Sequence, residues 1–141
     1  MERQQIIDSI KAKLEANPHV FALWLEGSLA DGSADNFSDV DLWADVEDGH
    51  EEEVLREIGA ILETLGPLDF RYSGPQPHPQ IHHWGFHLQG TDPHLLIDML
   101  VQSHSRDFWF TDENVFERPL LLFDKAGVVK SRPVSQGDEK K

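Results

Sequence analysis

Residues 19–46 read HVFALWLEGSLADGSADNFSDVDLWADV, and this stretch decides the fold. Residues 19–25 form an apolar run rich in β-branched and aromatic side chains. The run is too short for a typical helix and predicts a buried strand. Residues 39–46 alternate strictly between apolar side chains and a mostly acidic set. This alternation predicts a half-buried strand. The small polar residues 29–38 predict a loop with room for a short helical turn.

Amphipathic helices are predicted on both sides of this pair of strands. Residues 2–16 repeat apolar side chains on one helical face, and Asn17-Pro18 ends the run. Residues 50–65 repeat apolar side chains with helical spacing, and Gly66-Pro67 is the stop signal. Glu51-Glu52-Glu53 suits the first turn of that helix, where negative charge is favoured.

The second half of the sequence predicts more strands. A short strand at 68–72 leads into residues 73–79, whose three prolines prevent regular structure. Residues 81–89 and 95–102 predict an antiparallel hairpin. Residues 120–123 and 128–130 predict a second hairpin around 124–127, while 105–117 stay unassigned. Together these elements predict one α+β (α/β) domain over residues 1–131, with a mixed β-sheet flanked by helices. The polar residues 132–141 predict a disordered tail.

Composition excludes several kinds of protein. The chain has 141 residues, with 12 Lys plus Arg, 26 Asp plus Glu and no cysteine, and its formal net charge is -14. This length suits one domain. Without cysteine there is no disulfide, thiolate metal site or cysteine nucleophile, and a cytoplasmic location is expected. No apolar run approaches the ~20 residues that span a bilayer, so no membrane association is expected.

The acidic charge also bears on partners. Twelve scattered cations form no basic stripe. Non-specific binding of nucleic acid is therefore not expected, because it depends on Lys and Arg. A small-molecule substrate, a cationic ligand or a divalent metal held by carboxylates remains open.

Three features draw attention among the many acidic residues. Asp39 and Asp41 share one face of a predicted strand, where their charges repel unless a cation lies between them. Gly27-Ser28 ends an apolar strand, and glycine allows close backbone approach while serine can present N–H and hydroxyl to phosphate oxygens. Asp98 is the only ionisable residue in the apolar segment 95–101, where an unpaired carboxylate would be costly.

The combined pattern resembles the nucleotidyltransferase superfamily that includes DNA polymerase beta and the antibiotic nucleotidyltransferases. Its parts are a hydrophobic residue before Gly-Ser, ten intervening residues, an Asp-hydrophobic-Asp-hydrophobic run, and a later hydrophobic-Asp-hydrophobic run. The matching stretches are 25–28, 38–42 and 97–99, and the resemblance covers roughly residues 1–130. It implies a polymerase-beta palm-like sheet and transfer of a nucleoside monophosphate from a nucleoside triphosphate to an acceptor, with release of pyrophosphate.

The resemblance also assigns roles to individual residues. Asp39, Asp41 and Asp98 would be the catalytic carboxylates and would hold two Mg²⁺ ions, which offset the triphosphate charge and lower the pKa of the attacking hydroxyl. Asp98 could also accept the proton of that hydroxyl. Gly27 and Ser28 would hold the β- and γ-phosphates.

The sequence departs from the superfamily pattern at several points. Small relatives commonly carry a basic residue soon after Gly-Ser, whereas residues 29–32 have none, so Arg71 or Arg106 could supply the cation instead. Glu26 stands where a hydrophobic or aromatic residue is more usual. Antibiotic-modifying relatives often add a helical domain that binds the acceptor. A second copy or a partner protein could supply that wall here, through an aromatic cluster. The cluster is Phe108, Trp109, Phe110 and Phe116.

Several functions are compatible with this pattern. The acceptor is expected to be a hydroxyl of a small molecule, such as an aminoglycoside-like cation, or of a protein. The alternative is a catalytically weak nucleotide-sensing or partner-binding module, such as an antitoxin-like minimal nucleotidyltransferase. A metal-dependent hydrolase has no positive support, and the aspartates could also be solvated or structural. His82, His83 and His87 are expected to be structural or surface residues, and Trp43 could stack on a base or pack on the sheet.

Overall fold

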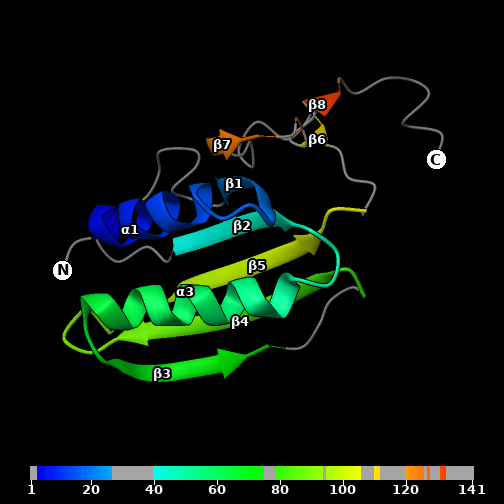
Figure 1. Cartoon of the computed structure of the whole chain (residues 1–141). Helices are drawn as coiled ribbons and strands as arrows, with labels where there is room; N and C mark the ends of the chain where they lie inside the picture. Colours follow the sequence, from blue (N-terminus) through cyan, green and yellow to red (C-terminus); the bar gives the residue numbers. More distant parts are fainter. Residues whose placement is uncertain are drawn as a thin grey trace.

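Two helices lie against one face of a six-stranded mixed sheet in the computed structural model of the chain (Figure 1). The structure describes residues 3–26, 40–74, 79–93, 95–105, 110–111, 120–125, 127 and 131–132. The helices are α1 (Arg3–Glu15) and α3 (Glu51–Leu65). The sheet contains β1 (Val20–Glu26), β2 (Val40–Val46), β3 (Leu68–Ser73), β4 (Ile81–Leu88), β5 (Ile97–Ser103) and β7 (Leu120–Asp124). The short strands β6 (Phe110–Thr111) and β8 (Ser131–Arg132) pair separately.

The strand order is β3-β4-β5-β2-β1-β7. All neighbours pair antiparallel except β2 and β5, which pair in parallel. Parallel neighbours need a long crossover connection, and here the connection contains α3, β3 and β4. This crossover brings residues 40–46 beside residues 97–103, at the centre of the sheet.

The core lies between the sheet and the helices. Apolar side chains repeat on one face of each helix and on alternate residues of the strands because those are the positions that face each other. The two helices also contact each other over this face. The buried core residues include Ile6, Ile10, Leu14, Leu23, Leu42, Val54, Leu55, Ile58, Leu62, Phe86, Ile97 and Met99.

The predicted elements are largely confirmed. Both helices, the strands on either side of the 29–38 loop and the antiparallel β4–β5 hairpin lie where the sequence predicts them. The α+β class with a mixed sheet is therefore confirmed, while a polymerase-beta palm-like arrangement stays a prediction. No helix within the described ranges is long and apolar enough to cross a membrane.

The strand β7 pairs with a strand from the start of the chain, whereas the sequence predicted a local hairpin for it. Among the described residues, β7 pairs with β1, and β1 then pairs on its other side with β2. The expected hairpin partner at 128–130 lies outside the described residues. Arg132, the first residue of the expected disordered tail, instead belongs to β8 and pairs with Thr111. The rest of that tail, 133–141, lies outside the described residues, as do Phe108, Trp109 and Phe116 of the aromatic cluster.

His87 is a buried structural residue, as the sequence suggested. Its Nδ1 lies 2.7 Å from Asp69 Oδ1, and its Nε2 lies 2.8 Å from the Asp92 carbonyl oxygen. Both oxygens accept, so only the doubly protonated ring can donate to both. The pKa of His87 is raised, first by the bond to the Asp92 carbonyl and further by Asp69, with burial opposing them.

This environment predicts a pH dependence of stability. A pKa that is higher in the folded state stabilises the fold fully below the unfolded pKa of about 6.5 and loses that contribution as pH rises through the folded pKa. Urea unfolding of the wild type and of His87→Gln is therefore expected to show a stability difference that shrinks from about pH 5.5 to pH 8.5. A difference that grows with pH would contradict the assignment.

Candidate functional site

Asp41 and Asp98 lie side by side on the face of the sheet that points away from the helices. The parallel register of β2 and β5 pairs the two residues directly. Adjacent strands lie about 4.8 Å apart, so the two side chains are immediate neighbours. Both are partly exposed. The sequence singles out both residues, and the structure brings them together on what we call the carboxylate face.

Glu26 extends this pair to a row of three acidic residues. The antiparallel register of β1 and β2 pairs Glu26 with Asp41. Its Oε2 accepts a hydrogen bond of 2.8 Å from Trp24 Nε1. The sequence showed Glu26 only as a departure from a family pattern. The available signal was its position, because antiparallel strands joined by a loop place the last residue of the first opposite the first residues of the second.

The three carboxylates of this row repel one another. Like charges directly across from each other destabilise a sheet, and the row contains two such neighbouring pairs. A cation among the carboxylates would remove the repulsion. Carboxylate oxygens are the donors that Mg²⁺ and Ca²⁺ prefer, so the side chains fit a hard divalent cation.

His83 also belongs to the site, although the sequence suggested only a structural or surface role for it. Its Nε2 lies 2.9 Å from Asp98 Oδ1, and the two side chains are 26% and 24% exposed. An ionised carboxylate only accepts hydrogen bonds, so the imidazole is the donor. The Tyr72 ring meets the His83 ring edge-on, with centroids 6.3 Å apart. These contacts fix the orientation of both His83 and the Asp98 carboxylate.

Gly85 lies beside Asp98 in the sheet. It pairs with Asp98 on one side and with Tyr72 on the other. A Cβ at Gly85 would lie 3.5 Å from Asp98 Oδ1 and 3.7 Å from Tyr72 Cδ1, which are ordinary contact distances. The glycine is thus not required by crowding, and it lies buried between a carboxylate and an aromatic ring. Next to it, Phe70 stacks on Tyr72, and both residues are 45% exposed.

Arg71 does not supply the missing cation, which corrects one expectation from the sequence. Its Nη2 donates to Glu63 Oε1 at 2.8 Å, and its guanidinium lies 5.8 Å from the centre of the Phe86 ring. Both partners belong to the helix side of the sheet. Successive strand residues point to opposite faces, so Arg71 and Tyr72 cannot share one. Arg106 lies outside the described residues.

Trp43 packs against another aromatic side chain of the sheet, which is one of the two roles expected for it. Its ring is stacked on Trp24, with centroids 6.1 Å apart and an interplanar angle of 11°. Trp24 is fully buried on the same face. The aromatic pair therefore forms a wall behind the carboxylates. Asp45, further along β2, is buried and accepts hydrogen bonds from Gln102 and His104 at 2.7 Å and 2.6 Å, so it is structural.

The remaining expected site residues are Gly27, Ser28 and Asp39, and they lie outside the described residues. They belong to the connection between β1 and β2, whose two ends are Glu26 and Val40. Their expected roles toward phosphate and metal stay predictions.

Comparison with known proteins gives little direct information. No protein-family model and no curated protein sequence matches this chain. A solved structure titled "structure of GLD-2/RNP-8 complex" is similar, with 14% identity and a TM-score of 0.47. The match covers 73% of this chain and 31% of that one, so this chain spans less than a third of the matched protein.

Proposed function

We propose that this chain is a divalent-metal-dependent nucleotidyltransferase domain. It would transfer a nucleoside monophosphate from a nucleoside triphosphate to a hydroxyl group and release pyrophosphate. The observation that carries the proposal is the direct pairing of Asp41 with Asp98 on adjacent parallel strands, with Glu26 beside them. One or two carboxylates together with the phosphates are the usual ligands of a triphosphate-bound Mg²⁺.

The aspartates carry the chemistry in this proposal, and Glu26 adds negative charge beside them. Asp41 and Asp98 would hold Mg²⁺ together with Asp39, which lies two residues before Asp41 in the sequence. When bound, Mg²⁺ offsets the charge of the triphosphate and lowers the pKa of the acceptor hydroxyl. Asp98 could accept the proton of that hydroxyl. His83 would hold the Asp98 carboxylate in position through the hydrogen bond to Oδ1.

The acceptor would lie over the sheet at Gly85, which has no side chain to occupy that position. Gly85 pairs with Asp98, the carboxylate proposed to receive the proton, and on its other side with Tyr72. The exposed rings of Phe70 and Tyr72 offer a flat surface against which a sugar ring or a planar group can pack. The net charge of -14 would attract a cationic acceptor such as an aminoglycoside-like compound. A protein hydroxyl is the alternative acceptor.

The test is release of pyrophosphate from ATP, GTP, CTP or UTP with aminoglycosides and a protein mixture as acceptors. We expect release that requires Mg²⁺ and an acceptor and stops when EDTA is added. Matched reactions of the Asp41→Asn variant provide the control. Release that persists in EDTA, or that proceeds equally without an acceptor, would contradict the transfer reaction.

A nucleotide-sensing or partner-binding module is the second candidate. One observation favours it: among the described strand residues of the six-stranded sheet, no Lys or Arg lies on the carboxylate face. Without a cation on that face, the charge of a triphosphate would be offset there by metal, and turnover would be slow. Binding of a nucleoside triphosphate with Mg²⁺, together with no pyrophosphate release with any acceptor, would favour this candidate.

A further inference from the structure

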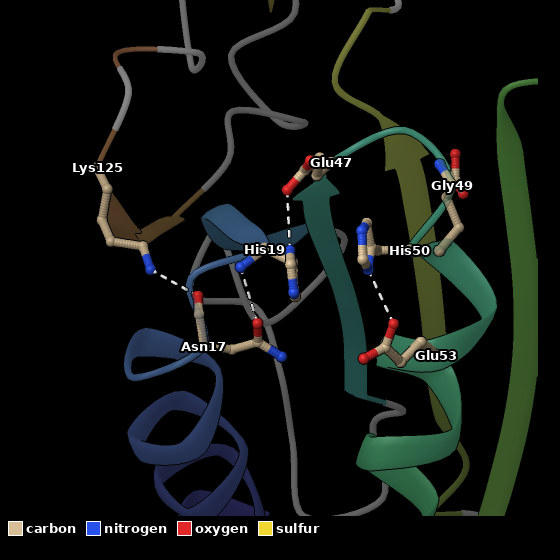
Figure 2. A network of polar contacts seen from close by, with 8 residues as sticks. Asn17, His19, Glu47, Gly49, His50, Glu53 and Lys125 are labelled. Atoms are coloured by element: carbon tan, nitrogen blue, oxygen red, sulfur yellow. Dashed lines mark hydrogen bonds and ion pairs between the residues drawn. The ribbon is translucent and has the colours of Figure 1, made fainter.

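A second group of metal-ligating side chains lies near the end of β2, whereas Asp41 lies near the start of that strand. His19 precedes β1, Glu47 follows β2, and His50 precedes α3. One ligand atom from each side chain lies within 4.8 Å of the other two. Glu47 is six residues along the chain from Asp41, or about 20 Å in an extended strand. Figure 2 shows the three side chains converging between the two helices and the end of β2.

The backbone holds these three residues in one place. The Glu47 N–H donates to the His19 carbonyl at 2.8 Å, and the His50 N–H donates to the Glu47 carbonyl at 3.0 Å. Gly49 closes the turn between them with a φ of 91°, a conformation that favours glycine. The His19 N–H donates to Asn17 Oδ1 at 2.8 Å, and Lys125 Nζ binds the Asn17 carbonyl at 2.9 Å. The backbone positions of the three residues are therefore fixed before any ligand binds.

His50 already has the outer contact that a ligating histidine commonly uses. Its Nδ1 lies 2.8 Å from Glu53 Oε2, which leaves its Nε2 as the ligand atom. His19 Nδ1 lies 2.9 Å from Glu47 Oε1, so these two proposed ligands contact each other directly. The two rings are stacked, with centroids 3.7 Å apart and an interplanar angle of 10° (Figure 2).

We propose that His19, Glu47 and His50 form a binding site for a zinc-class divalent cation, separate from the carboxylate row. Two imidazoles and one carboxylate are a common zinc donor set, which water completes to four ligands, whereas Mg²⁺ and Ca²⁺ prefer oxygen alone. The ring nitrogen binds a metal through a lone pair in the plane of the ring, so two nearly parallel stacked rings cannot both point at one ion. One ring must therefore rotate out of the stack. All three side chains are between 31% and 49% exposed, which leaves room for that rotation.

Such a site would join two connections of the fold. It would tie the α1–β1 connection to the end of β2 and to the start of α3. A cation that binds only the folded chain stabilises it in proportion to its occupancy. The inference does not rest on the proposed transferase activity, because none of its residues belongs to the carboxylate row.

The test is isothermal titration of the EDTA-treated, dialysed full chain with Zn²⁺ alone, with Co²⁺ absorption as a check on coordination. We expect one Zn²⁺ per chain at this site. The affinity should fall at least tenfold in His19→Asn and in His50→Asn and stay unchanged in Asp41→Asn. Circular dichroism establishes that each variant is folded, and Glu47→Gln replaces either histidine variant that is not.

Glu52 and Glu53 give a matched pair on the first turn of α3. Both substitutions to Gln remove one negative charge, but only Glu53 contacts His50. We expect about a tenfold loss of Zn²⁺ affinity in Glu53→Gln and none in Glu52→Gln. Equal losses in the two variants, unchanged binding in both histidine variants, loss of binding in Asp41→Asn instead, or no Zn²⁺ binding at all would overturn the proposal.

Discussion

Replacing Asp41 by Asn is expected to reduce Mg²⁺-dependent pyrophosphate release by about a thousandfold or more. Asp41 is the middle member of the acidic row, between Glu26 and Asp98. The substitution removes a proposed metal ligand from the centre of the row. Stabilisation of a transferring phosphoryl group by metal amounts to several kcal/mol. The measurement is the initial rate of pyrophosphate release at saturating triphosphate and Mg²⁺.

The control for this substitution is Asp8→Asn on the exposed side of α1, where Asp8 accepts a hydrogen bond from Gln4. That variant should retain the wild-type rate. Asp41→Asn should also unfold in EDTA at the wild-type temperature or above it, because it relieves repulsion between neighbouring carboxylates. A rate within tenfold of the wild type, or a large loss of thermal stability in EDTA, would mean that Asp41 is a structural residue.

Replacing Phe86 by Ala is expected to cost about 3–5 kcal/mol of the free energy of unfolding. Phe86 belongs to β4, and its side chain is fully buried against α3. Gly59 lies beside the Phe86 ring, and its missing side chain leaves room for Arg71, because a Cβ there would lie 2.9 Å from Arg71 Nη2. The substitution would leave a cavity and also remove the ring beneath the Arg71 guanidinium. Domains have only about 5–15 kcal/mol of stability in total, so much of it would be lost.

Phe70→Ala is the matched comparison on the neighbouring strand. The Phe70 ring is 45% exposed, and its removal should cost about 1 kcal/mol or less. Urea unfolding of the two variants measures the difference. Equal losses would show that the helix side of the sheet is not the main core.

Local periodicity accounts for the parts of the fold that the sequence predicts correctly. Residues 50–65 repeat at helical spacing, and residues 40–46 alternate, so one face of each can be assigned without any knowledge of neighbours. Residues 20–26 differ because both Leu23 and Trp24 are fully buried, on opposite faces of β1. A strand buried on both faces shows no alternation, and this concealed the orientation of Glu26.

The site depends on contacts between distant parts of the chain, which periodicity cannot show. The pairing of Asp41 with Asp98 follows from the register of the β2–β5 crossover. The contact between His83 and Asp98 needs the register of the β4–β5 hairpin as well. The group formed by His19, Glu47 and His50 depends on two separate connections meeting at the end of β2. The sequence around each of these residues does not indicate which distant residue it contacts.

Thermal unfolding of the wild type and of Asp98→Asn with each nucleoside triphosphate tests the central claim most directly, because that claim is that the acidic row binds a metal-bound triphosphate. The wild-type melting temperature should rise with a triphosphate only when Mg²⁺ is present, because a ligand specific to the folded state stabilises it. Asp98→Asn should lose most of that rise. An equal rise without Mg²⁺, an equal rise in the variant, or no rise with any triphosphate would contradict the account.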